Sequence, residues 1–311
     1  MRHAVACKLL LAAALAATSS VARAQEQTVR LPDGRQMALA CAGSGRSTVV
    51  FEAGLGSSMR SWALVMDGLQ KQARVCAYDR AGYPGSDAGP VPRDADHVVA
   101  DLHAMLRAAK LTGPFVLVGE SVGGYYVRLY ADLYPRDVAG MVLVDPAFPG
   151  EAKATAKASP SMAADLARRG VAQQVCLGAL AKGQSWSETD PRYANCGAPP
   201  RNGDAASRAK ATMSEEGSAD HSGDQVAHAQ GSRPDVPVIV LTADRATDQV
   251  PGMTAAERLS VRQVLVTGHQ AIARGYPRGR QRTVANTSEA IQNDQPGAVI
   301  AAVREVLAQG R

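Results

Sequence analysis

The chain has 311 residues and a formal net charge of +5 at pH 7. Three of its basic residues and none of its acidic residues lie within the first 24 positions, so the remaining residues, about 287, carry a net charge of only +2. The sequence therefore shows no basic patch that would indicate nucleic-acid binding. The remaining length suits one sizeable α/β domain with an insertion.

The first 24 residues have the pattern of a secretory signal peptide. A basic start with Arg2 and Lys8 precedes a short apolar run at residues 9–17 and a small-x-small site at residues 22–24. We therefore expect the mature chain to begin at Gln25 and to lie in the periplasm or outside the cell. The apolar run is too short to cross a bilayer, and no other stretch is long enough, so we expect no membrane-spanning segment.

Strand and helix patterns alternate from about residue 28 to residue 146. The first two strand patterns flank a Pro-Asp-Gly turn, which is a hairpin signal. The expected strands cover residues 28–31, 36–40, 48–51, 74–78, 115–118 and 138–144, and the expected helices run through 62–69, 98–106 and 122–134. Several of the strand runs are apolar without alternation, as in strands buried on both faces. This order predicts an α/β protein with a mostly parallel, doubly wound sheet.

Residues 147–234 interrupt the alternation. Alanine-rich helical stretches there alternate with polar stretches that contain Gly, Pro and Ser, which predicts a helical cap over the sheet. The core pattern then resumes with a strand at 237–241, a helix at 255–274, a short strand at 282–286 and an amphipathic helix around 299–307. We expect a core formed by residues 25–146 and 235–311, and a cap formed by residues 147–234.

The pentapeptide Gly-Glu-Ser-Val-Gly at residues 119–123 lies between an expected strand and an expected helix. A serine raised above the end of a strand must sit on a strained turn, where side chains two positions before and after it would collide. Both flanking positions are therefore glycine. The N–H groups at the start of the following helix favour a developing negative charge at the same point. The pattern predicts that Ser121 is a nucleophile.

These pieces, in this order, resemble the α/β-hydrolase superfamily of serine esterases and lipases. The segment Ala-Gly-Leu-Gly-Ser-Ser at residues 53–58 stands where the family has its oxyanion loop, and residues 78–86 are similar to the family's Asp-x-x-Gly-x-Gly-x-Ser turn. The resemblance covers residues 29–307 and implies the α/β-hydrolase fold. It also implies that the backbone N–H groups of Leu55 and Val122 form the oxyanion hole.

The same resemblance leaves the catalytic acid open. Family members place it after either of two strands, which makes Asp145 and Asp248 equal candidates, with Asp244 behind them. The resemblance also makes a disulfide between Cys41 and Cys76 plausible, because the family's second strand lies beside the strand that contains Cys76. Cys176 and Cys196 would then pair within the cap.

The catalytic base departs from the family pattern. Relatives have the histidine in a segment Ser-His-x-Ile-Gln-x-Asp-x-Pro after the last strand, whereas residues 288–296 read Ser-Glu-Ala-Ile-Gln-Asn-Asp-Gln-Pro. Glu289 therefore stands at the histidine position. No histidine follows His269, which lies in an expected helix and is interpreted as a helix-surface or core residue. An ordinary glutamate, with a pKa of about 4.3, is a weaker base than imidazole.

Three interpretations of Glu289 stay open: a substitution that disables a hydrolase, a natural change to a binding protein, or a working base. The leading expectation is an exported hydrolase that acts on a small-molecule carboxylic ester through a Ser121 acyl-enzyme. The alternative is a non-catalytic ligand-binding protein that keeps the pocket. Nothing in the sequence indicates a metal or an organic cofactor, and the sequence identifies neither the substrate nor the oligomeric state.

Overall fold

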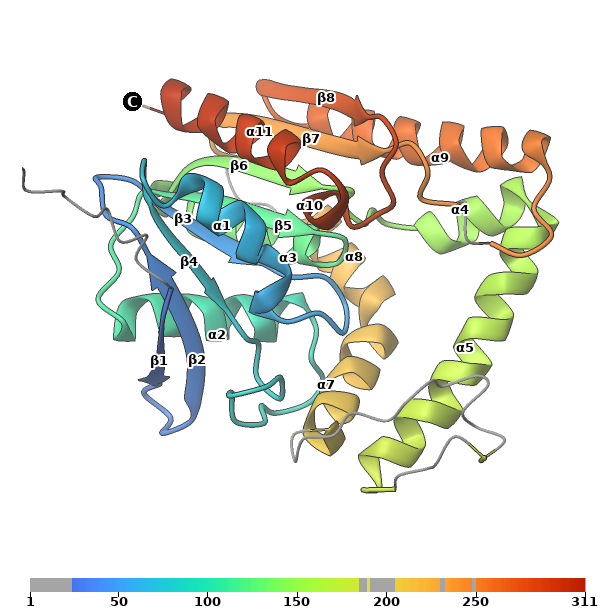
Figure 1. Cartoon of the computed structure of the whole chain (residues 1–311), viewed down its shortest axis with the longest axis horizontal. Helices are drawn as coiled ribbons and strands as arrows, with labels where there is room; N and C mark the ends of the chain where they lie inside the picture. Colours follow the sequence, from blue (N-terminus) through green and yellow to red (C-terminus); the bar gives the residue numbers. More distant parts are fainter. Residues whose placement is uncertain (1–23, 185–188, 191–204, 230–232, 248–249, 311) are drawn as a thin grey trace, which may run out of the picture.

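The computed structural model describes residues 24–184, 189–190, 205–229, 233–247 and 250–310. These residues form an eight-stranded sheet in the order β1-β2-β4-β3-β5-β6-β7-β8 (Figure 1). Strand β2 is antiparallel to both of its neighbours, and every other neighbouring pair in the described sheet is parallel. The strands are β1 (Gln25–Arg30), β2 (Gln36–Ala42), β3 (Thr48–Glu52), β4 (Arg74–Tyr78), β5 (Phe115–Glu120), β6 (Val138–Val144), β7 (Pro237–Ala243) and β8 (Arg278–Val284). The predicted fold class is therefore confirmed.

Helices cover both faces of the sheet. The 3-10 helix η1 (Met59–Trp62), α1 (Ala63–Leu69), α10 (Ile291–Asp294) and α11 (Pro296–Gln309) pack on one face, and α2 (Ala95–Ala108), α3 (Gly123–Leu133) and α9 (Ala255–Arg274) pack on the other. A short 3-10 helix, η2 (Pro135–Asp137), links α3 to β6. Within β5, Val116 and Val118 pack in the hydrophobic cluster on the face covered by α1 and α11, whereas Phe115 and Leu117 pack in the cluster on the face covered by α2 and α3. A central strand with apolar side chains on both faces explains the uninterrupted apolar run in the sequence.

Between β6 and β7 the chain forms α4 (Glu151–Ala158), α5 (Pro160–Ala181), α7 (Ala205–Gly217) and α8 (Ala219–His228). Figure 1 shows α5 and α7 extending beside the sheet, and α4 packs against α9 while α8 packs against α2 and α3. The division into a core (25–146 and 235–311) and a cap (147–234) stays a prediction. The signal-peptide prediction falls on residues 1–23, outside the described residues, and only Ala24 is described.

The last strand differs from its predicted bounds. The sequence predicted residues 282–286, whereas β8 covers Arg278–Val284. Three of its residues are arginines, and most of its side chains are exposed or half-buried because β8 is one of the two edge strands of the described sheet. An edge strand lacks the apolar run that marks a buried strand, so the start of β8 gave no hydrophobic signal.

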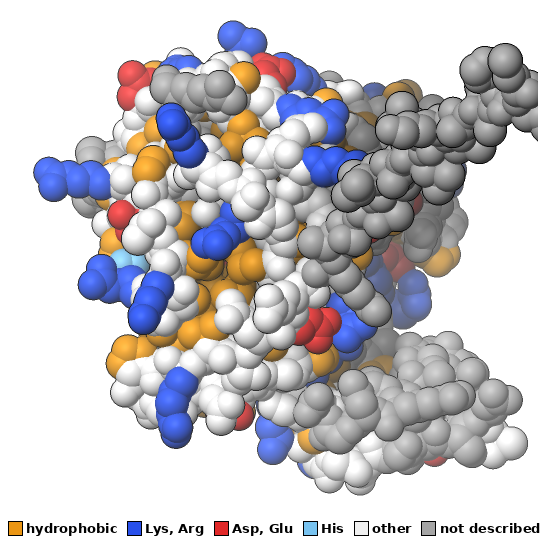
Figure 2. All heavy atoms as spheres, turned by 60° about the vertical axis from the view of Figure 1, so that its left-hand side comes forward, with side chains coloured by type: hydrophobic (Ala, Val, Ile, Leu, Met, Phe, Trp, Pro, Cys, Tyr) orange, Lys and Arg blue, Asp and Glu red, His pale blue; other side chains and the backbone are white. Residues whose placement is uncertain are grey.

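Cys41 and Cys76 lie directly opposite each other in the β2–β4 pair and form a disulfide with a Cα–Cα distance of 4.2 Å. This pairing confirms the prediction. Cys176 is disulfide-bonded, but its predicted partner, Cys196, lies outside the described residues, so that pairing stays a prediction. In the described ranges, every helix is too short or too polar to span a membrane. On the face in Figure 2, Lys and Arg side chains are scattered among uncharged ones rather than gathered in one patch.

Candidate active site

Ser121 lies on the sharp turn between β5 and α3 and has a φ of +52°. This left-handed backbone conformation is uncommon for a residue with a side chain; it costs free energy and persists only where the surroundings hold it. The Ser121 N–H donates to the Val144 carbonyl at 3.1 Å, and the Ser121 carbonyl accepts from Gly124 and Ala147 at 2.9 and 3.0 Å. Bonds on both sides therefore fix the serine at the carboxyl end of β5.

The two glycines of the motif lie where a side chain cannot fit. A Cβ on Gly119 would be 2.5 Å from the Gly123 carbonyl oxygen, and a Cβ on Gly123 would be 2.8 Å from the Ala53 carbonyl oxygen. Both contacts involve backbone atoms, which cannot move aside easily. The close approach of β5, α3 and the loop after β3 therefore requires glycine at both positions.

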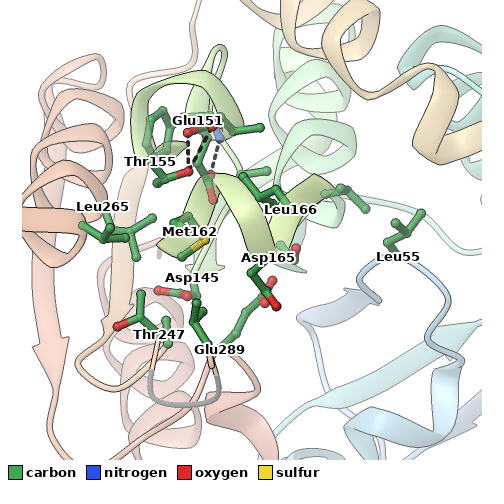
Figure 3. A pocket seen from close by; sticks show the side chains of 18 of the residues that line it. Leu55, Asp145, Glu151, Thr155, Met162, Asp165, Leu166, Thr247, Leu265 and Glu289 are labelled. Atoms are coloured by element: carbon green, nitrogen blue, oxygen red, sulfur yellow. Dashed lines mark hydrogen bonds between the residues drawn. The ribbon is translucent and has the colours of Figure 1, made fainter. Parts of the chain in front are cut away.

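A cavity of about 740 Å³ opens beside Ser121. It brings together five of the predicted site residues from four separate segments, namely Leu55, Ser121, Val122, Asp145 and Glu289. Figure 3 shows Asp145 and Glu289 near each other, with Leu55 on the other side of the cavity. Asp248 lies outside the described residues. Asp244 does not line this cavity, and its Oδ1 accepts from the Thr287 N–H at 3.1 Å.

Asp145 follows the last residue of β6 and, like Ser121, has a positive φ, of +43°. Its N–H donates to the Leu241 carbonyl at 2.8 Å, and its Oδ1 accepts from the Ala243 N–H at 2.8 Å. The side chain is buried. Burial and the nearby Glu289 carboxylate raise the pKa of Asp145 well above its ordinary value, against the opposing effect of the Ala243 hydrogen bond.

Glu289 lies in the loop between β8 and α10, and it is exposed. Its neighbours anchor the loop: the Ser288 N–H and Oγ both donate to the Asp294 carboxylate at 2.7 Å, and the Glu289 carbonyl accepts from the Ile291 N–H at 2.9 Å. Hydrogen bonds therefore hold the segment around Glu289, and this segment presents a carboxylate to the cavity.

Two further carboxyl groups at the site escaped the sequence analysis. Glu120 is buried, and its Oε2 accepts from the Gly54 N–H at 2.7 Å. Glu151, at the start of α4, lines the cavity and accepts from the Phe148 N–H at 3.2 Å. Burial first and the Glu289 charge second raise the pKa of each of these groups to about 7. Glu120 was visible as the residue before Ser121, whereas no sequence signal marked Glu151.

His269 lines the cavity but is buried, and neither ring nitrogen is free. Its Nε2 lies 2.9 Å from the Pro146 carbonyl oxygen, so Nε2 carries the proton. Its Nδ1 lies 2.8 Å from Thr242 Oγ1 and 3.8 Å from Asp145 Oδ1. Burial lowers the pKa of His269 to about 4. The structure therefore places it as a hydrogen-bonded core histidine.

Within the described ranges, no group of three or more His, Cys, Asp or Glu residues has an arrangement that could hold a metal ion. Two carboxyl groups that line the cavity, Asp145 and Glu151, have raised pKa values, as does the buried Glu120 next to Ser121 in the chain. The arrangement can present a serine hydroxyl, two backbone N–H groups and a carboxylate to one bound molecule.

A family model described as "alpha/beta hydrolase fold" matches residues 47–221. The uncharacterized protein YqjL of Bacillus subtilis (strain 168) is 38% identical over 105 residues, which is 34% of this chain and 42% of that protein. A mouse (lyso)-N-acylphosphatidylethanolamine lipase is 30% identical over 104 residues, 32% of this chain and 30% of that protein. This chain therefore spans less than half the length of these relatives.

Among solved structures, a thermophilic esterase from Thermogutta terrifontis has a TM-score of 0.56 and 21% identity, over 92% of this chain and 99% of that one. At this identity, the structural likeness shows a shared fold.

Proposed function

The chain belongs to the alpha/beta hydrolase fold family, and on that premise we propose that it is an exported serine hydrolase that cleaves carboxylic esters through a Ser121 acyl-enzyme. The observation that supports this most is the φ of +52° at Ser121, a residue that backbone hydrogen bonds hold and that lines a cavity together with Leu55, Val122 and Glu289. A strained serine at such a point is the expected geometry of a nucleophile. The Cys41–Cys76 disulfide supports export, because disulfides persist in oxidising compartments.

In the proposed acylation step, Ser121 Oγ attacks the ester carbonyl carbon while its proton passes to the Glu289 carboxylate. The carbonyl oxygen becomes an oxyanion that accepts hydrogen bonds from the Leu55 and Val122 N–H groups. The tetrahedral intermediate then collapses: the C–O bond to the alcohol breaks, and the alcohol leaves with the proton from Glu289. In deacylation, water attacks the acyl carbon, Glu289 takes its proton, and Ser121 recovers it as the acid departs.

The contrasting surroundings of two carboxyls support Glu289 as the base. Two neighbouring carboxyl groups resist ionising together, and the more buried one keeps the proton. Asp145 is buried and its pKa is raised, whereas Glu289 is exposed in the cavity. Asp145 is therefore the protonated partner in this proposal. A carboxylate is a weaker base than imidazole at neutral pH, so we expect slow turnover.

The alternative is a binding protein that keeps the cavity without turnover. The observation that favours it is the absence, among the described cavity residues, of a histidine free to take the Ser121 proton, because both nitrogens of His269 are occupied. A binder of this kind would hold ester-like or acid ligands beside Ser121 and leave them unchanged.

A fluorophosphonate probe separates the two functions. We expect covalent labelling at Ser121, located by mass spectrometry of the digested protein, together with slow release of p-nitrophenol from p-nitrophenyl acetate. Ser121→Ala removes both signals, whereas Ser61→Ala, in η1 with its Oγ on the Ser58 carbonyl, keeps both. Absence of labelling and turnover in folded wild-type protein would exclude the hydrolase and favour the binding protein.

A further inference from the structure

Arg80 is a buried cation beside the proposed oxyanion loop. It follows β4 by two positions and is 2% exposed. Its Nη1 donates to the Ala53 carbonyl at 2.6 Å, and its Nη2 donates to the Gly54 carbonyl at 2.9 Å. These are the two peptide carbonyls immediately before Leu55. One guanidinium therefore binds both peptide groups that lead to the proposed oxyanion donor.

Because of the geometry of the peptide bond, these contacts also fix the direction of the Leu55 N–H. In a trans peptide the C=O and N–H bonds point in opposite directions. With the Gly54 carbonyl held by Arg80, the Leu55 N–H of the same peptide must point away from Arg80. The preceding peptide is fixed at both ends, because its carbonyl binds Arg80 and its N–H, on Gly54, donates to Glu120 Oε2 at 2.7 Å.

Glu215 of helix α7 holds Arg80 in turn. Arg80 Nε and Nη2 donate to the two oxygens of the Glu215 carboxylate, each at 2.8 Å. This two-point contact fixes both the position and the plane of the guanidinium. On the sheet side, Arg80 Nη1 donates to Glu52 Oε1 at 2.7 Å. Both carboxylates are almost fully buried, so Arg80 is clamped between β3 and a helix of the β6–β7 insertion.

A second set of contacts joins α7 to the same loop. The Tyr83 hydroxyl donates to Glu215 Oε2 at 2.7 Å and accepts from the Gly56 N–H at 3.1 Å. Arg208, also on α7, donates from Nη2 to the Gly56 carbonyl. The peptides on both sides of Leu55 therefore bind groups that α7 supplies or orients.

We propose that Arg80 and Glu215 are a positioning pair: they couple the packing of helix α7 against the core to the direction of the Leu55 N–H. The proposal rests on the proposed function, because it assigns Leu55 as an oxyanion donor. When α7 is packed against the core, Glu215 fixes Arg80, and Arg80 fixes the Gly54–Leu55 peptide. When Glu215 is lost or α7 moves away, the Arg80 contact to the Gly54 carbonyl loosens, and this carbonyl keeps only the bond from the Ser57 N–H at 3.2 Å, so the Leu55 N–H is held less firmly in its direction. Helix α7 thus acts on the site without touching the reacting atoms.

The first test compares Glu215→Gln with Glu216→Gln. The Glu215 variant keeps the size of the side chain but removes the carboxylate that binds Arg80, and the Glu216 variant makes the same change on the neighbouring residue of α7. We expect Glu215→Gln to slow Ser121 labelling by a fluorophosphonate 10- to 100-fold, less than or comparable to removal of an oxyanion donor. Hydrogen–deuterium exchange of residues 53–57 should rise in parallel. Glu216→Gln should leave both within 3-fold of wild type.

A milder variant decides the question if Glu215→Gln does not fold. Tyr83→Phe removes one hydroxyl, which donates to Glu215 and accepts from the Gly56 N–H and from Arg80 Nη2, while the Arg80–Glu215 pair itself stays. We expect labelling to slow 2- to 10-fold with faster exchange at residues 53–57. Unchanged labelling and unchanged exchange in the folded variants would overturn the positioning pair. If wild-type protein is not labelled at all, the proposed function fails, and the exchange data alone still decide whether Glu215 orders the loop.

Discussion

A Cβ atom on Gly119 would lie 2.5 Å from the backbone carbonyl oxygen of Gly123. The contact joins the end of β5 to the first residue of α3, so the turn that raises Ser121 leaves no room for even a methyl group. We expect Gly119→Ala to lower the free energy of unfolding by about 1–3 kcal/mol, the usual range for overpacking in a closed site. Urea unfolding followed by circular dichroism measures this change.

Gly170→Ala is the matched control for that variant. Gly170 lies inside helix α5, where an added Cβ meets nothing within 4 Å. Alanine is favoured over glycine in a helix interior by about 1 kcal/mol, so this change should leave stability equal or slightly higher. Equal stability of the two variants would contradict the close packing described for the turn.

Glu120 makes the stability of the folded protein fall as the pH rises. Burial and the Glu289 charge raise its pKa to about 7 from an ordinary 4.5, so the folded protein binds more protons here than the unfolded chain does. The stabilisation is complete below about pH 4.5 and is lost as the pH rises to about 7. Glu120→Gln removes this titration while keeping an acceptor for the Gly54 N–H.

We therefore compare the free energies of unfolding of Glu120→Gln and wild type. The difference, variant minus wild type, should increase by on the order of 2–3 kcal/mol between pH 4.5 and pH 8. Urea unfolding at a series of pH values measures the difference. Glu26→Gln, on exposed strand β1, is the control and should follow the wild-type curve. Parallel curves for wild type and Glu120→Gln would show that the folded state does not raise this pKa.

The fold could be predicted from the sequence wherever burial on both faces leaves an apolar run. The observed β4 and β6 match the predicted 74–78 and 138–144, and α9 matches the predicted 255–274. The start of β8 could not be predicted, because an edge strand that contains Arg278 and Arg280 has no such run.

The candidate site could likewise be predicted from the sequence only in part. Ser121, Glu289 and Asp145 could be named as candidates because each follows a strand in a recognisable local motif; the cavity brings them together, and their roles stay predictions. The Arg80–Glu215 contact was not, because it joins residues 135 positions apart and α7 has no motif of its own. The raised pKa of Glu151 depends on the burial of a whole cavity wall, which no local pattern encodes.

A substitution of His269 tests whether His269, rather than Glu289, is the base for Ser121. Its two ring nitrogens bind Thr242 and Pro146, and burial lowers its pKa to about 4. We expect His269→Gln to lower the unfolding free energy by about 1–3 kcal/mol, because buried partners lose their hydrogen bonds. The pH profile of Ser121 labelling should stay unchanged in the protein that remains folded. A variant that folds but is no longer labelled would identify His269 as the base and remove Glu289 from that role.

Glu289→His introduces the side chain that the family resemblance predicts at this position. In subtilisin, loss of the histidine costs about 10⁶ in turnover, and a positioned general base typically contributes 10²–10⁴. We therefore expect Glu289→His to hydrolyse p-nitrophenyl acetate at least 100-fold faster than wild type at pH 8. The rate should fall as the pH drops through the imidazole range near 6.5, because protonated imidazole cannot accept the Ser121 proton. Glu305→His, on α11 and outside the lining of the cavity, should leave the rate unchanged. If wild type is already fast and the histidine variant is slower, Glu289 is an efficient base, and the site has adapted to a carboxylate rather than lost an imidazole.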